Sequence, residues 1–90
     1  MFVVIAYDIP DDARRGRLAD ELENWGRRAQ KSVFEFDLDE ARFAMLLEQV
    51  RCLTASEDQV RVYRLCRRCL ADSEVVRGLN FATDPGYYQV

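Results

Sequence analysis

Apolar residues run almost without a break through positions 2–9, and this pattern is typical of a strand buried on both faces of a sheet. Side chains alternate along a strand, so residues 3, 5 and 7 share one face and residues 4, 6 and 8 share the other. Asp8 therefore ends an otherwise apolar strand. The first segment of the chain is predicted to be a central strand that carries one acid at its end.

Two later stretches have helical spacing. Pro10 and the aspartates after it predict a turn and an N-cap, and apolar residues then recur at helical intervals until Gly26 stops the pattern. This predicts a helix over about residues 11–25. Asp39 predicts the cap of a second helix, because the apolar residues from Phe43 to Leu53 keep a regular helical spacing.

The remaining core segments alternate as strands do. Residues 28–38 predict either one bent strand or two short paired strands with a break near Lys31 and Ser32, and residues 60–65 predict a last strand after a polar link. The order is β-α-β-β-α-β, so we expect an α/β fold of the ferredoxin-like plait type. Two helices cover only one face of such a sheet, and the bare face predicts a homodimer.

The C-terminal residues 72–90 are too apolar for a free tail. We expect them to add an edge strand, across the dimer in one arrangement, and to wrap back onto the sheet. The chain is interpreted as one domain of residues 1–90, with a core of about 1–68 and a dimer-associated segment of about 69–90. That length suits one domain and is too short for two.

Composition narrows the possible chemistry. The chain is 49% hydrophobic and 32% charged, as expected of a folded soluble domain. No apolar run approaches a membrane span, and residues 1–8 lack a basic leader, so we expect a cytoplasmic protein with no membrane partner. The absence of histidine excludes Ser-His-Asp and Cys-His catalysis and His-ligated zinc within the chain.

Charge is unevenly distributed. The net charge is −3, which does not favour a protein coated in positive potential. Arginine is nevertheless the side chain best suited to bidentate phosphate contacts, although any single surface arginine is more often a solvated charge. The basic residues form three groups, which are Arg14, Arg15 and Arg17, then Arg27, Arg28 and Lys31, then Arg61, Arg64, Arg67 and Arg68.

Asp8 is the leading candidate for chemistry, because an acid that closes an apolar strand is costly unless its charge is compensated. It either caps the following turn or pairs with an arginine, or it binds a metal; Arg14 and Arg15 are expected nearby. Two copies of Asp8 near a dimer axis could share one Mg²⁺. Tyr7 and Phe34 are interpreted as core, with base stacking the alternative for Phe34.

The motif Cys66-Arg67-Arg68-Cys69 is a single CxxC without a second pair. A structural zinc site would need more ligands, so two ordinary thiols are favoured, while zinc shared across a dimer or a redox pair remains an alternative. With Cys52, the count of cysteines is odd, which predicts reduced thiols.

A longer pattern has a family likeness. The string from Tyr7 to Asp12, the following Arg14-Arg15 pair, Leu18 and the segment Gln30–Glu35 together resemble the small CRISPR-associated family found beside the spacer-acquisition integrase. The likeness runs from Met1 to about Cys66. The sequence departs from the family pattern at Gly16, at Phe36 and in the C-terminal tail.

The resemblance implies a ferredoxin-like homodimer that acts in antiviral defence, with a C-terminal strand joining the partner's sheet. It implies a Mg²⁺-dependent endonuclease that cleaves single-stranded RNA or double-stranded DNA, and an adaptor between two integrase dimers during spacer integration. At the matching positions, Asp8 would be the metal ligand, supported by Tyr7, Arg15, Arg17, Arg28 and Phe34.

We therefore expect phosphodiester hydrolysis in which Mg²⁺ at paired Asp8 residues orients or activates water, while Arg15, Arg17 or Arg28 stabilises phosphate charge. The alternative is a dimeric scaffold that holds duplex DNA through arginine-phosphate contacts and performs no chemistry. A third interpretation, a regulatory domain for a small ligand, fits the fold but has no pocket motif.

Overall fold

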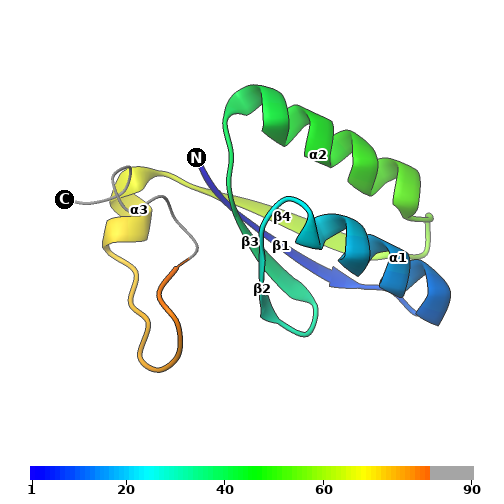
Figure 1. Cartoon of the computed structure of the whole chain (residues 1–90), viewed down its shortest axis with the longest axis horizontal. Helices are drawn as coiled ribbons and strands as arrows, with labels where there is room; N and C mark the ends of the chain where they lie inside the picture. Colours follow the sequence, from blue (N-terminus) through cyan, green and yellow to red (C-terminus); the bar gives the residue numbers. More distant parts are fainter. Residues whose placement is uncertain (82–90) are drawn as a thin grey trace.

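A computed structural model describes residues 1–81 of the chain, which form a four-stranded antiparallel sheet with helices packed on one side (Figure 1). The sheet order is β2-β3-β1-β4. The elements in chain order are β1 Phe2–Asp8, α1 Asp12–Glu23, β2 Arg27–Gln30, β3 Val33–Asp37, α2 Glu40–Leu53, β4 Gln59–Leu65 and α3 Arg67–Ala71.

This arrangement confirms the ferredoxin-like plait. β1 lies in the middle of the sheet and pairs antiparallel with both β3 and β4, while β2 pairs antiparallel with β3 at the edge. Residues 27–37 form two short paired strands with the break at Lys31 and Ser32, which settles the choice left open by the sequence. A register shift between Arg28 and Gln30 bends β2.

The core lies between the sheet and the two long helices. Val3, Ile5 and Tyr7 of β1 are buried there, and their strand partners Phe34 and Phe36 are fully buried beside them. The alternation predicted for β1 is therefore confirmed. Leu18, Leu22, Leu46 and Val50 supply the helix side of the same core.

Local capping explains where the helices begin. The Asp11 carboxylate accepts a hydrogen bond from the Arg14 backbone N–H at 2.7 Å, and the Asp39 carboxylate accepts one from the Arg42 N–H at 2.8 Å. Each bond satisfies an amide that has no partner inside the helix. α1 ends at Glu23, before the expected residue 25, because the chain must turn into β2 at Gly26. A Cβ on Gly26 would lie 2.2 Å from the Glu35 carbonyl oxygen.

Among residues 1–81, no helix covers the second face of the sheet (Figure 1). The register places Val4, Ala6 and Asp8 of β1 on this open face with Tyr63 of β4, whose exposed fraction is 48%. Phe2 belongs to the same face but is fully buried, because the ring of Phe81 packs edge-on against it with ring centroids 5.7 Å apart.

The segment after β4 differs from the expectation. Residues 67–71 form the short helix α3, which the sequence did not predict and which lies apart from α1 and α2 (Figure 1). Residues 72–81 form no strand, although their last residue returns to Phe2. The rest of the predicted C-terminal edge strand falls on residues 82–90, outside the described residues. Among residues 1–81 no helix is long and apolar enough to cross a membrane.

Candidate functional site

Asp8 is the last residue of β1 and is exposed on the open face of the sheet. Its strand partner across the sheet is Gln59 of β4. Within residues 1–81 its carboxylate has no hydrogen bond or ion pair to another side chain, and the cap of α1 is Asp11, not Asp8. Neither a cap nor an ion pair with an arginine therefore compensates the charge of Asp8 within the described residues.

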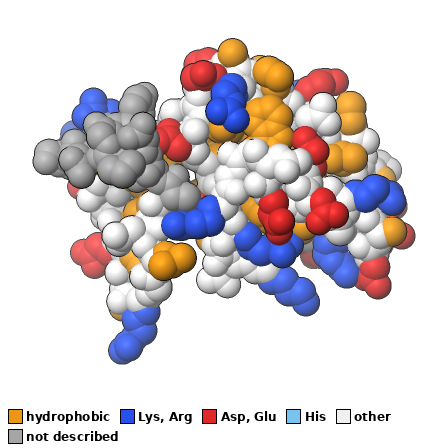
Figure 2. Space-filling view, viewed as in Figure 1, with side chains coloured by type: hydrophobic (Ala, Val, Ile, Leu, Met, Phe, Trp, Pro, Cys, Tyr) orange, Lys and Arg blue, Asp and Glu red, His pale blue; other side chains and the backbone are white. Residues whose placement is uncertain are grey.

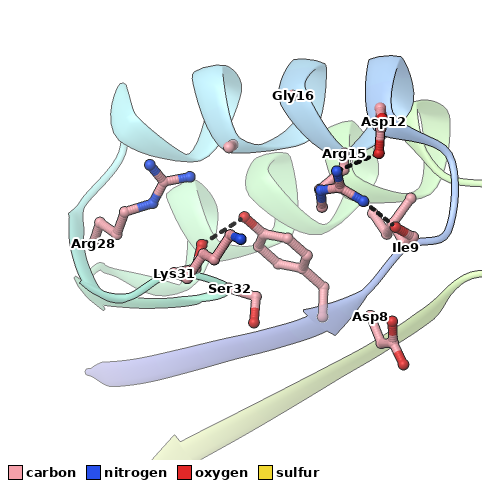
Figure 3. Close-up of a pocket in the computed structure, with 10 residues that line it drawn as sticks. Asp8, Ile9, Asp12, Arg15, Gly16, Arg28, Lys31 and Ser32 are labelled. Carbon is pink, nitrogen blue, oxygen red and sulfur yellow. Dashed lines mark hydrogen bonds and ion pairs between the residues drawn. The ribbon is translucent and has the colours of Figure 1, made fainter.

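A cavity of about 510 Å³ lies beside the end of β1, between α1 and the β2–β3 turn (Figure 3). It brings together three cations, Arg15, Arg28 and Lys31, from three different elements of the chain. Basic side chains also gather below α1 in the space-filling view, with acidic groups next to them (Figure 2). The residues lining the cavity are Tyr7, Asp8, Ile9, Asp12, Arg15, Gly16, Ala19, Arg28, Lys31 and Ser32.

The two cavity arginines are held by contacts that leave part of each guanidinium accessible. Arg15 Nη1 donates to the Ile9 carbonyl oxygen at 2.9 Å, and Nη2 donates to the Asp12 carboxylate. The Arg28 guanidinium lies 5.1 Å from the centre of the Phe34 ring, with Glu23 3.6 Å away. The Arg15 and Arg28 side chains are 40% and 43% exposed, so both can still meet an anion from solvent.

Tyr7 and Phe34 form the floor beneath these cations. Their rings are stacked with centroids 6.3 Å apart, and the Tyr7 hydroxyl donates to the Lys31 carbonyl oxygen at 3.5 Å. Tyr7 is 6% exposed and Phe34 is fully buried, which confirms that both are core residues. Base stacking on Phe34 is not available in this structure, because no face of its ring reaches solvent.

Asp8 and Arg15 line the same cavity, as the sequence predicted, but the two side chains do not point toward each other. α1 packs on the face of β1 that carries Tyr7, whereas the Asp8 carboxylate points to the opposite face, away from Arg15 and Arg28 (Figure 3). Strand alternation is the physical cause, since adjacent residues of a strand point to opposite sides. The helical-wheel argument placed Arg15 at the correct end of β1 but did not consider the direction in which the Asp8 side chain points.

Arg14 forms an ion pair with the Asp58 carboxylate. Its Nε donates to Asp58 Oδ2 at 2.6 Å and its Nη2 to Asp58 Oδ1 at 2.8 Å, while Nη2 also meets Glu57 at 2.9 Å. The hydrogen bond from Arg14 holds the pKa of the Asp58 carboxyl below its usual range, and the same bond raises the pKa of Arg14. Arg14 therefore ties the start of α1 to the loop before β4.

Of the other arginines, one predicted site residue lies outside the cavity, and one that the sequence analysis grouped by charge alone lies on the face that carries Asp8. Arg17 is exposed on α1 but does not line the cavity. Arg61 is exposed on β4 and shares the open face with Asp8, two residues along the strand from Gln59. The alternating pattern of residues 59–65 could have placed Arg61 on the open face, because alternation fixes which β4 side chains share a face.

One chain offers few ligands for a metal. No group of three or more acidic or cysteine side chains is close enough to hold an ion among the described residues. Mg²⁺ is commonly held in proteins by one or two carboxylates and keeps several waters. An exposed carboxylate without an internal partner fits this requirement, provided that a second copy of the chain or a substrate phosphate supplies further oxygens.

The fold and the site together define a class: a small ferredoxin-like subunit whose central strand ends in an exposed carboxylate without a side-chain partner within residues 1–81, beside a cavity lined by basic side chains. The chain matches the family described as CRISPR associated protein Cas2 over residues 1–73, and it belongs to that family.

Two relatives show how far the likeness extends. The chain is 45% identical over 73 residues to CRISPR-associated endoribonuclease Cas2 3 of Synechocystis, covering 80% of this chain and 79% of the relative. It is 41% identical over 92 residues to CRISPR-associated endoribonuclease Cas2 3 of Chloroflexus aurantiacus, covering 100% of this chain and 98% of the relative.

Solved structures agree with the fold. A hypothetical protein from Thermus thermophilus has a TM-score of 0.74 at 38% identity, covering 87% of this chain and 90% of that one. Streptococcus pyogenes Cas2 has a TM-score of 0.72 at 24% identity, covering 86% and 100%. A chain in a partial Cas6-RT-Cas1–Cas2 complex has a TM-score of 0.73 at 26% identity, covering 88% and 93%.

Proposed function

We propose that this chain is a Mg²⁺-dependent endonuclease that acts in the cytoplasm as a homodimer and takes part in CRISPR spacer acquisition. Its substrate class is single-stranded RNA, double-stranded DNA or both. The observation that supports the proposal is the exposed Asp8 carboxylate at the end of β1, which has no side-chain partner within residues 1–81. The endoribonuclease names of relatives at 45% and 41% identity point the same way.

The open face of the sheet is the surface on which two copies would meet. It carries Val4, Ala6 and the half-exposed Tyr63, and apolar surface of this kind favours association. A two-fold interface uses the same surface on both copies, so a face that contains Asp8 brings two Asp8 carboxylates toward one axis. Those two groups are the residues that would hold the metal.

Mg²⁺ bound there would supply an activated or oriented water for phosphodiester hydrolysis. The chain's own residues would provide charge, a metal ligand and phosphate contacts. Asp8 provides negative charge and an oxygen ligand on the open face, and Arg61 on the same face provides a cation for a phosphate group. Arg15, Arg28 and Lys31 bind further phosphates of the same strand at the helix-side cavity.

Cleavage of labelled single-stranded RNA and duplex DNA, with Mg²⁺ or with EDTA, tests this proposal. We expect metal-dependent cleavage by the wild type and its loss in Asp8→Asn. Asp20→Asn is the matched control, because Asp20 is an exposed acid of α1 that does not line the cavity. Equal cleavage by wild type and Asp8→Asn, in preparations shown free of contaminating nuclease, would contradict the proposal.

The direction of the Asp8 carboxylate relative to the cavity cations favours a second, non-catalytic function. Although Asp8 lines the cavity, its carboxylate points away from Arg15 and Arg28 (Figure 3), so the cavity cations can hold a phosphate backbone without any contribution from that carboxylate. The alternative is therefore a non-catalytic dimer that binds duplex DNA and joins CRISPR integrase subunits. The similar chain in a partial Cas6-RT-Cas1–Cas2 complex supports such a partner.

Duplex binding separates the two functions. The scaffold predicts salt-sensitive duplex binding that is unchanged in Asp8→Asn and weakened in Arg28→Ala. Copurification of the chain with an integrase subunit, retained in Asp8→Asn, would support the same role. An inactive wild type that binds duplex DNA would favour the scaffold over the nuclease.

A further inference from the structure

Cys66 and Cys69 form a close thiol pair at the end of β4 that pairs with Phe2, opposite the Asp8 end of β1. Cys66 follows the last residue of β4, and Cys69 lies in the first turn of α3. Their sulfur atoms are 3.3 Å apart, within hydrogen-bond distance, and both residues are exposed. A disulfide bond is about 2.05 Å long, so a small side-chain rotation brings the two atoms together.

Backbone hydrogen bonds hold the two cysteines close together. The Cys69 N–H donates to Cys66 Sγ at 3.3 Å, and the Leu70 N–H donates to the Cys66 carbonyl oxygen at 3.0 Å. Leu70 is 4% exposed and anchors α3, while the Ser73 hydroxyl donates to the Cys69 carbonyl oxygen at 2.7 Å. The two thiols are therefore kept facing each other by the local fold.

The two thiols have different acidities. The backbone N–H of Cys69, followed by the hydrogen bond between the two sulfurs, lowers the pKa of Cys66. The same sulfur hydrogen bond and the charge on Cys66 raise the pKa of Cys69. A thiolate is the nucleophile in disulfide exchange, so Cys66 is the more reactive partner near neutral pH.

We propose that Cys66 and Cys69 are a reversible dithiol-disulfide site that reacts with low-molecular-weight disulfides of the oxidised glutathione class, Cys66 attacking first and Cys69 resolving. This inference does not depend on the nuclease proposal. Cys52 provides a comparison within the same chain, because it is an exposed thiol on α2 whose contact is Glu48 Oε1 at 4.0 Å.

The exchange occurs in two balanced steps. The Cys66 thiolate attacks one sulfur of the disulfide, which forms a mixed disulfide at Cys66 and releases one thiolate. Cys69 loses its proton to solvent and attacks the Cys66 sulfur, which forms the bond between Cys66 and Cys69 and releases the second thiolate. The protein loses two electrons and two protons, and one disulfide is reduced to two thiols.

The position of the pair gives the bond a structural consequence. The ring closed by the disulfide contains Arg67 and Arg68 and joins the end of β4 to α3, which precedes the segment that returns to Phe2 through Phe81. Arg27 Nη2 also donates to the Asn80 carbonyl oxygen on this return path. Oxidation would therefore stiffen the junction that leads the C-terminal segment back to the sheet.

The test equilibrates the full-length protein in glutathione buffers of graded ratio, blocks free thiols by alkylation, and measures the products by mass spectrometry. We expect an oxidised form that has lost the mass of two hydrogen atoms, with Cys52 still alkylated. The tryptic fragments that contain Cys66 and Cys69 should remain joined in it, and excess dithiothreitol should reverse the change.

Single substitutions assign the roles. Cys69→Ser removes the resolving thiol, so we expect a mixed disulfide with glutathione to accumulate at Cys66. Cys66→Ser should leave Cys69 slower to react than Cys66 is in the wild type. The proposal is overturned if the wild type forms only mixed disulfides, or if Cys66 and Cys69 stay reduced in every buffer that oxidises Cys52.

Discussion

The Arg14 guanidinium donates two hydrogen bonds to the Asp58 carboxylate, from Nε to Oδ2 at 2.6 Å and from Nη2 to Oδ1 at 2.8 Å. The Asp58 side chain is fully buried, and its Oδ2 also accepts the Ala55 N–H at 2.8 Å. This contact joins the first turn of α1 to the loop that precedes β4. Because α1 follows β1 in the chain and β4 pairs with β1 from Gln59 onward, the pair helps to fix the strand that carries Asp8.

Loss of this pair should destabilise the fold, and acid should have the same effect. The pKa of folded Asp58 lies below its ordinary value of 3.8. The stabilisation is therefore present above about pH 4 and is lost as pH falls through the lower folded pKa. We expect Asp58→Asn to unfold at lower urea concentration than wild type at pH 7, with the difference shrinking at about pH 3.

Urea titrations followed by circular dichroism measure this difference. Glu57→Gln is the control, because Glu57 contacts Arg14 from a position whose side chain is 60% exposed. It should shift the midpoint far less than Asp58→Asn. An equal loss in both variants, or a difference that does not change with pH, would count against the stabilising role of the buried pair.

Gly16 is a helix residue with room for a side chain. Nothing lies within 4 Å of the position that a Cβ would occupy, and the residue borders the basic cavity. Alanine is favoured over glycine inside a helix by about 1 kcal/mol. Gly16→Ala should therefore raise the melting temperature by about 4–8 °C for a domain of this size, measured by calorimetry. A lower melting temperature would show that the site is more crowded than the structure indicates.

The open face should mediate self-association. Tyr63→Glu places a charge in the middle of that face, so we expect it to shift the protein from dimer to monomer in size-exclusion chromatography with light scattering. Met45→Glu is the matched control, since Met45 is 59% exposed on α2, on the other side of the molecule. A monomeric wild type, or a dimer that tolerates Tyr63→Glu, would contradict the proposed interface.

The cavity cations should bind phosphate. Arg28→Ala and Lys31→Ala should each weaken nucleic-acid binding and lower the slope of log K against log salt by about 1, as expected when one phosphate contact is lost. Fluorescence anisotropy at several salt concentrations measures this slope. Arg51→Ala, an exposed arginine of α2 outside the cavity, should leave it unchanged. Identical slopes in all the variants would remove the cavity from the binding surface.

Much of the fold was predictable because local patterns matched the tertiary structure. The apolar run through β1, the cap at Asp39 and the spacing from Phe43 to Leu53 each specify one element and its buried face. The end of α1 was less predictable, because the turn at Gly26 depends on a close approach to β3 that local sequence does not reveal. α3 was missed because its five residues show no helical repeat.

The sequence predicted the positions of single site residues better than it predicted how their side chains are arranged relative to one another. Asp8 lies on the open face as its alternation indicated, and Arg15 and Arg28 do share a cavity. The direction of the Asp8 carboxylate, away from these arginines (Figure 3), was missed, because the strand alternation was not combined with the side of the sheet that α1 covers. Arg14 was grouped with the phosphate-binding arginines, but its partner Asp58 is 44 residues away in the sequence.

The central claim is that the Asp8 carboxylate performs chemistry while the cations of the adjoining cavity, Arg28 among them, bind nucleic acid. The most direct test measures binding and Mg²⁺-dependent cleavage of the same labelled substrate for wild type, Asp8→Asn and Arg28→Ala. The account predicts that Asp8→Asn binds like wild type and does not cleave, whereas Arg28→Ala binds more weakly and still cleaves at saturating protein. Undiminished cleavage by Asp8→Asn would contradict it.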